Sequence, residues 1–183
     1  MQARALELPL TVALAATLRA GETVALSGDV LTARDAAHQR LTAALRTGAP
    51  LPVSLADATL YYTGPTPAPP GEVVGAAGPT TASRMDVDTE ALLAAGVRVL
   101  IGKGERGAAV AAALQRYAAV YLAAIGGAGA YLNTRITACR VLAYADLGTE
   151  AIYVMRVKAF PAIVAQDAHG GNVYHRGDGP LRG

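Results

Sequence analysis

The spacing of apolar positions along the chain changes repeatedly between a helical period and short continuous runs. Apolar stripes at helical spacing predict helices at residues 10–18, 32–47, 89–96 and 105–118. Short apolar runs bounded by glycine or polar turns predict strands at residues 22–28, 58–63, 97–102, 119–125, 151–157, 160–167 and 173–175, with a further short strand within residues 72–81. The pattern therefore predicts an α/β fold with a mixed sheet.

Residues with special backbone preferences set the predicted boundaries of these elements. Thr32 is expected to cap the second helix, with Asp35 three residues later in a capping-box pattern, and Gly48 is expected to end it. Asp88 is expected to cap the third helix. Residues 27–29 are expected to form a turn after the first strand. Each of the last three helices then follows shortly after a strand or turn.

The order of the elements indicates one domain over residues 1–183. Residues 97–125 form a strand–helix–strand unit, which favours a right-handed parallel crossover. Residues 64–72 are rich in proline, and apolar segments resume on both sides, so we interpret them as an ordered loop and not as a linker.

Composition narrows the function classes. The 183 residues are 52% hydrophobic and 16% charged with a formal net charge of +2, which gives no electrostatic footprint for DNA or an anionic membrane. A single cysteine, Cys139, excludes an internal disulfide and a cysteine-built metal or iron–sulfur site. Residues 10–18 lack a clean cleavage site, and the apolar run at 118–132 is too short to cross a bilayer. We expect a cytoplasmic protein.

Two cations stand at predicted ligand-binding positions. Arg34 lies in the first turn of a helix, where the helix dipole disfavours a cation, so it is either a solvated surface group or part of an anion site together with free N–H groups. His38 is one turn further on the same side. Lys103 stands between Gly102 and Gly104 at the carboxyl end of a strand, where open α/β sheets bind ligands, although an ordinary βα turn has the same form.

The segment GPTTASRMD at residues 78–86 places two hydroxyls and a guanidinium on one turn. Thr80 and Arg84 are four residues apart and share a face if the turn leads into helix. The alternative is a threonine-capped turn in which Arg84 pairs with Asp88. Convergence of Arg34, Arg84 and Lys103 would suit a small dicarboxylate, since arginine forks hold carboxylates by two hydrogen bonds. From the residues alone, the chain is a binder of a small organic acid, with or without catalysis.

Six motifs occur in an order that resembles the C-terminal domain of class I fumarases and the β subunit of two-subunit fumarases and L(+)-tartrate dehydratases. They are SGDVLTARDAAH (27–38), GPTTASRMD (78–86), GKG (102–104), AIGGAGA (124–130), LGTEAIYV (147–154) and FPAIVAQD (160–167). The resemblance implies a swivelling β/β/α domain and the reversible addition of water to a C4 dicarboxylate in the tricarboxylic acid cycle. It also implies a [4Fe–4S] cluster, which an α subunit would carry, and a homodimer or α2β2 assembly.

The resemblance also assigns roles to residues. It implies that Thr80 is the catalytic base, that Arg34 and Arg84 bind substrate carboxylates, and that Lys103 is a further substrate contact. Thr81 lies beside the base and is expected to support the turn and the substrate site. Ser83 departs from the glycine common in one-chain relatives. The leading hypothesis is a fumarate hydratase; L(+)-tartrate dehydratase and a non-catalytic dicarboxylate-binding or assembly module are the alternatives.

Overall fold

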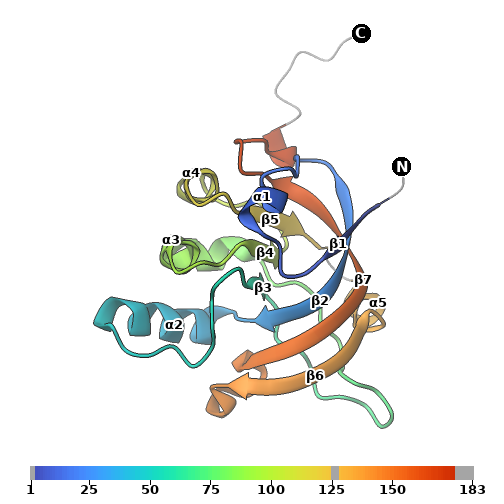
Figure 1. Cartoon of the computed structure of the whole chain (residues 1–183). Helices are drawn as coiled ribbons and strands as arrows, with labels where there is room; N and C mark the ends of the chain where they lie inside the picture. The colour runs from blue at the N-terminus through green and yellow to red at the C-terminus, as the bar shows by residue number, and fades with distance from the viewer. Residues whose placement is uncertain (1–2, 125–127, 176–183) are drawn as a thin grey trace.

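The computed structural model describes residues 3–124 and 128–175, and a seven-stranded sheet dominates it (Figure 1). Its strands are β1 (Arg4–Glu7), β2 (Thr23–Thr32), β3 (Thr59–Tyr61), β4 (Val99–Gly102), β5 (Val120–Ala123), β6 (Ile136–Ala143) and β7 (Ile152–Gln166). The α-helices are α1 (Val12–Ala15), α2 (Asp35–Thr47), α3 (Asp86–Ala94), α4 (Ala108–Arg116) and α5 (Gly129–Asn133), and 3₁₀ turns form η1 (Ala82–Met85), η2 (Ala145–Glu150) and η3 (Val173–His175).

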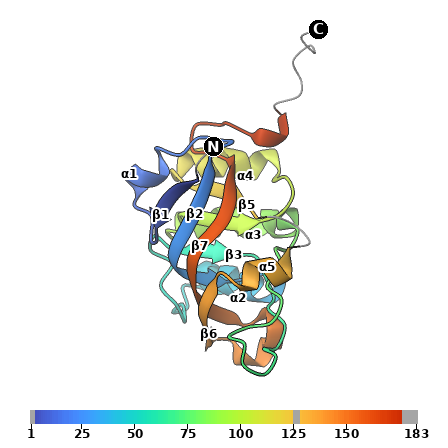
Figure 2. The ribbon, with the colours of Figure 1, turned by 90° about the vertical axis from the view of Figure 1, so that its right-hand side faces the viewer.

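The sheet closes on itself through β7. Strands β2, β3, β4 and β5 pair in parallel in that order, and β7 is antiparallel to both β2 and β5. Strand β1 adds in parallel to the outer edge of β2, and β6 adds antiparallel to β7. Figure 2 shows β1, β2, β7 and β6 curving together over one side of the molecule, and Figure 1 shows α2, α3 and α4 on the opposite side. The predicted mixed α/β sheet is confirmed.

Side-chain alternation along the parallel strands builds two separate cores. Tyr61 and Ile101 point into a cluster enclosed by the curved sheet, together with Leu26 and Phe160. Their chain neighbours, such as Leu100, belong to a second cluster on the other face. Helices α2, α3 and α4 cover that face (Figure 1). Strands covered on both faces must be apolar throughout, which explains their continuous hydrophobic runs. The result is three layers: curved sheet, parallel sheet and helices.

The start of α2 corrects one sequence prediction. The helix begins at Asp35. Thr32 is the last residue of β2 and does not cap α2. The Thr32 hydroxyl donates to the carbonyl of Ala151 at 3.1 Å and accepts from the N–H of Tyr153 at 2.9 Å. Tertiary contacts with β7 therefore use the hydroxyl that a capping box would need. Gly48 ends α2 with a φ of 70°, as predicted.

Strand β2 is also longer than expected. Residues 27–29 continue the strand through a bulge opposite β7 and do not form a turn. Gly28 has a φ of 128°, and a Cβ there would lie 2.8 Å from the Cβ of Leu8, so a glycine at a bulge was mistaken for a turn glycine. In the same way, Asp88 lies inside the first turn of α3, which begins at Asp86.

The number and lengths of the strands also differ from the sequence prediction. The two strands predicted at 151–157 and 160–167 are one strand, β7, which runs through Pro161. The segment at 173–175 is a 3₁₀ turn, and residues 72–81 contribute an isolated bridge at Thr81 and no strand. Strands β1 and β6 were not predicted.

The predicted parallel crossover is confirmed as β4–α4–β5. The expected continuation of its second strand and the glycine turn at 125–127 lie outside the described residues, as does part of the AIGGAGA motif. Within residues 3–124 and 128–175, no helix has the length and hydrophobicity needed to cross a membrane.

Candidate functional site

The sequence-predicted residues gather at one edge of the sheet. Arg34 follows the end of β2 by two residues, and Lys103 follows β4 directly. Strands β2, β3 and β4 are parallel neighbours, so their carboxyl ends lie at the same edge. This is the edge at which α/β sheets bind ligands.

The GPTT segment lies between the extensions of β3 and β4. The N–H of Thr80 donates to the carbonyl of Tyr62 at 2.7 Å, and the carbonyl of Thr80 accepts from the N–H of Lys103 at 3.1 Å. The N–H of Ala82 then donates to the carbonyl of Lys103 at 2.9 Å. The segment is thus held by its backbone on both sides, which leaves the threonine side chains out of the scaffold.

Gly102 makes this insertion possible. A Cβ at position 102 would lie 2.9 Å from the Cβ of Ala82 and 3.0 Å from the ring of Tyr62. Only a residue without a side chain lets the two backbones approach this closely. The glycine before Lys103 is therefore a packing requirement of the neighbouring segment.

Arg34 and Arg84 converge on one carboxylate, that of Asp35. The Nε of Arg34 donates to Asp35 Oδ2 at 3.1 Å, and Nη2 of Arg84 lies 2.8 Å from Asp35 Oδ1. Partial burial would raise the pKa of Asp35, but the hydrogen bond from Arg34 and the charge of both arginines outweigh it and hold the pKa below its usual value. Arg84 therefore pairs with Asp35, and the alternative pairing with Asp88 is wrong.

Glu150 is a second carboxylate on Arg34 that the sequence analysis did not single out. Its Oε1 lies 3.1 Å from Nη2 of Arg34, and its Oε2 accepts the N–H of Ala36 at 2.8 Å. It comes from η2, more than 100 residues away along the chain. No local spacing could have revealed this contact, although the LGTE motif marked the segment.

The hydroxyls and the lysine remain available to a ligand. Among the described residues, the side chains of Thr80, Thr81 and Lys103 have no hydrogen-bond or ion-pair partner. Thr80 is half-buried, whereas Thr81 and Lys103 are exposed. The arrangement can hold carboxylates on its cations and present one sheltered hydroxyl beside them.

Arg106 is a further residue that sequence reasoning missed. It is 2% exposed, and its Nε donates to Asp86 Oδ1 at 2.6 Å while its Nη2 donates to the hydroxyl of Thr89 at 2.6 Å. Its guanidinium also lies over the rings of Tyr62 and Tyr121. These contacts tie the segment after Lys103 to α3, so they fix the two halves of the site relative to each other.

His38 lies behind the site and is 1% exposed. Neither ring nitrogen has a hydrogen-bond partner among the described residues, and the ring meets Tyr62 edge-on at 5.7 Å between centroids. Burial, reinforced by the positive charge of Arg106, lowers the pKa of His38 to about 3. The ring is therefore neutral at pH 7 and does not act as a cation in the site.

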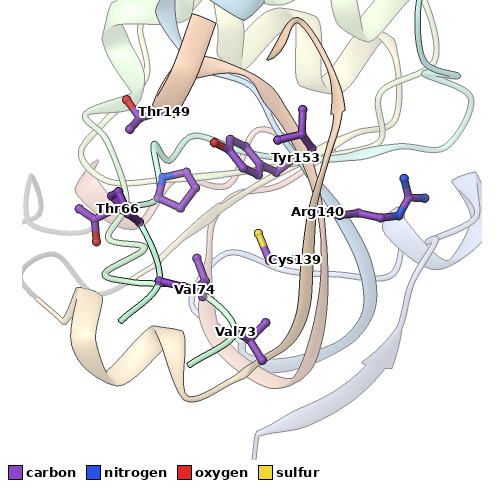
Figure 3. A pocket seen from close by; sticks show the side chains of 11 residues that line it. Thr66, Val73, Val74, Cys139, Arg140, Thr149 and Tyr153 are labelled. Carbon is purple, nitrogen blue, oxygen red and sulfur yellow. The ribbon is translucent and has the colours of Figure 1, made fainter. Parts of the chain in front are cut away.

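The chain's own residues do not fit an iron–sulfur cluster. Its single cysteine, Cys139, lies on β6 and lines a hollow of about 350 Å³ together with Val73, Val74 and Tyr153 (Figure 3). In the described ranges, no group of three or more His, Cys, Asp or Glu side chains could hold a metal. Among the described residues, Arg140 is the one cation that lines this hollow, so the hollow is a poor match for a dicarboxylate.

The fold is a closed mixed sheet with helices on one face, and three cations, Arg34, Arg84 and Lys103, lie at or beside the carboxyl ends of its parallel strands. Comparison with known sequences identifies the protein family. The family model described as "Fumarase C-terminus" matches residues 2–177, so the chain belongs to the fumarase C-terminal family. The resemblance seen in the sequence motifs is confirmed.

Relatives fall into two kinds by length. The chain is 36% identical over 155 residues to the mitochondrial fumarate hydratase 1 of Leishmania major and 35% identical over 155 residues to the aerobic class I fumarate hydratase of Escherichia coli K12. Each match covers 84% of this chain but 28% of the relative. It is 34% identical over 163 residues to a putative L(+)-tartrate dehydratase subunit beta of Methanocaldococcus jannaschii, covering 86% of this chain and 84% of that one.

Replacing Gly102 with alanine should disturb the site without abolishing the fold. The added methyl group would push Ala82 and Tyr62 away, and such overpacking costs about 1–3 kcal/mol. We expect urea denaturation to show this loss of stability. Gly78→Ala is the control, because Gly78, like Gly102, has no left-handed φ, and a Cβ there would make only an ordinary contact, 3.5 Å from the Cα of Gly129. Equal stability of Gly102→Ala and wild type would contradict the packing role.

Folding stability should fall on acidification because of His38. Its pKa in the folded state is about 3, below its ordinary value of 6.5, so the unfolded chain takes up a proton first. The contribution of neutral His38 to the free energy of unfolding is fully present above pH 6.5. It decreases by about 1.4 kcal/mol per pH unit as the pH falls from 6.5 towards 3. Urea denaturation at pH 7.5 and 5.0 measures the loss. His38→Leu should reduce this loss, and an unchanged slope in His38→Leu would contradict the assignment.

Proposed function

We propose that the chain is the β subunit of a two-subunit hydro-lyase that interconverts fumarate and malate. The observation that carries the proposal is that Arg34 and Arg84 share the carboxylate of Asp35 at the strand ends where the backbone of Thr80 is also held, and the Thr80 hydroxyl has no partner among the described residues. Membership of the fumarase C-terminal family supports the reaction class. A relative of matching length that is named as a subunit beta supports a separate partner chain.

In this proposal the chain binds and orients the substrate and moves one proton. Arg34 and Arg84 hold substrate carboxylates through hydrogen-bonded ion pairs, for which guanidinium has the matching planar fork. Lys103 contributes a further positive charge near Thr80. During dehydration of malate the Thr80 Oγ1 accepts the proton that leaves carbon, and during hydration it returns that proton. A nearby cation favours the negatively charged form of an oxygen base, which a threonine needs in order to act.

The remaining chemistry is assigned to an α subunit. A [4Fe–4S] cluster would supply a Lewis acid for the substrate hydroxyl, and one cysteine in this chain cannot bind such a cluster. The α subunit would also supply the acid. The proposed location is the cytoplasm, and the proposed unit is residues 1–183 as one fumarase C-terminal-like domain in an assembly that includes the α subunit.

L(+)-tartrate dehydratase is the second candidate. It is favoured by the match to the putative subunit beta from Methanocaldococcus jannaschii over most of both chains. Its substrate is also a C4 dicarboxylate, so the same cations would serve. A non-catalytic dicarboxylate-binding or assembly module is the alternative from another class, and it requires that Thr80 have no role in turnover.

Co-expression with an α subunit under anaerobic conditions tests the proposed function. The purified complex should hydrate fumarate, whereas this chain alone should be colourless and inactive. Dehydration of L-tartrate without turnover of fumarate would select the second candidate. A complex that binds dicarboxylates and converts neither substrate would support the non-catalytic module.

Substitution of Thr80 separates the two hydroxyls. Thr80→Ala should lower kcat by about 10²–10⁴-fold, because loss of a positioned base removes that much rate. Thr81→Ala is the matched control, since Thr81 is adjacent, exposed and, like Thr80, has no side-chain partner among the described residues, and it should change kcat far less. Steady-state kinetics on the assembled complex measures both. Similar losses in the two variants would overturn the assignment of the base.

The arginine fork can be tested by a substitution that keeps the charge. Arg34→Lys should raise KM for fumarate, since an ammonium keeps the charge but lacks the planar set of donors that lets one side chain contact Asp35, Glu150 and a substrate carboxylate together. The exposed ion pair between Arg40 on α2 and Asp146 on η2 provides the control Arg40→Lys. A KM for Arg34→Lys equal to that of wild type would argue against carboxylate binding.

A further inference from the structure

Arg34 forms an ion pair with Glu150, a residue more than 100 positions away along the chain. Glu150 ends η2, and the next residue, Ala151, is fixed to the end of β2 because its carbonyl accepts the hydroxyl of Thr32 at 3.1 Å. The backbone that carries Glu150 is therefore anchored to the strand that leads into Arg34. One carboxylate oxygen then contacts Arg34 and the other accepts the N–H of Ala36 in the first turn of α2.

Glycine packing restricts the same guanidinium from another side. A Cβ at Gly64 would lie 2.9 Å from Nη1 of Arg34 and 3.0 Å from the carbonyl of Thr149. The missing side chain makes room for the guanidinium between the loop after β3 and η2. Arg34 is 24% exposed in its side chain, so it is confined but accessible.

Carboxylates of the protein contact one edge of the Arg34 guanidinium, and the other edge has no such contact among the described residues. Nε is bound by Asp35 and Nη2 by Glu150, which together occupy the side-on edge. Nη1 has no hydrogen-bond partner among the described residues. Two carboxylates on one edge hold the guanidinium plane in a single orientation, which a single ion pair on a flexible side chain does not achieve.

We propose that Glu150 is the positioning residue of Arg34, which fixes the guanidinium by its side-on edge and presents Nη1 to a substrate carboxylate. The inference rests on the proposed function for the identity of the ligand. The inference gives the LGTE motif a role in the site, because Glu150 of this motif would set the orientation in which Arg34 meets the substrate. Glu150 acts through Arg34 and does not itself contact the substrate.

The test uses Glu150→Gln in the complex of this chain with its α subunit. The amide oxygen can still accept the N–H of Ala36, so the helix keeps its cap, whereas the negative charge beside Arg34 is lost. The matched control is Asp146→Asn, which removes a carboxylate from the same η2 turn and from an ion pair with the same helix α2, at Arg40. Unfolding temperatures of both variants report any general loss of structure.

We expect Glu150→Gln to raise KM for fumarate by about tenfold and to change kcat by less than about threefold. Asp146→Asn should behave as wild type. In an Arg34→Lys background the Glu150→Gln change should add little, since residues that act through one another are not additive. A wild-type KM for Glu150→Gln, or a full additional effect in the Arg34→Lys background, would overturn the proposal.

A second measurement on the full chain does not depend on activity. Nitrogen NMR of the Arg34 guanidinium should show hindered rotation about the Nε–Cζ bond in wild type and in Asp146→Asn, and free rotation in Glu150→Gln. Unchanged rotation in Glu150→Gln would also overturn the inference. A wild-type complex that converts neither fumarate nor L-tartrate would instead count against the proposed function, and the NMR result would still decide the positioning role.

Discussion

The pairing of β7 with both β2 and β5 is the constraint on which the rest of the structure depends. It closes the sheet and encloses one core, while the helices cover the second core on the other face. With the sheet closed, the ends of β2, β3 and β4 are fixed as neighbours. The strand ends then bring together residues as distant in sequence as Arg34 and Lys103. The positions of these residues are set by the strands that they follow, β2 and β4.

Charge balance organises the site that these strand ends create. Asp35 joins Arg34 to Arg84, Glu150 orients Arg34, and Asp86 anchors Arg106 below the site. Each guanidinium therefore has a carboxylate partner before any ligand is considered. Buried or half-buried cations without such partners would be expensive, so the carboxylates are a condition for gathering several arginines at one edge.

The sequence predicted the mixed sheet, the crossover β4–α4–β5 and the residues of the edge, because these depend on local periodicity and on glycines at strand ends. It failed where a distant contact decided the outcome. Thr32 was expected to cap a helix, but its hydroxyl joins β2 to β7. Arg84 was given Asp88 as its alternative partner, and the fold supplied Asp35. Glu150 could not be placed beside Arg34 from spacing, since only the closed sheet brings η2 to the start of α2.

The carboxylates around the arginines have a consequence for how a ligand arrives. Three cations at the edge, Arg34, Arg84 and Lys103, face two carboxylates, Asp35 and Glu150, so the group carries a formal charge of +1. Such an edge projects little positive potential into solution, and the whole chain adds only +2. Under the proposed function, capture of a dianionic substrate then depends on short-range geometry instead of long-range steering. The association rate should consequently vary little with ionic strength, unlike that of a binding site lined by unpaired cations.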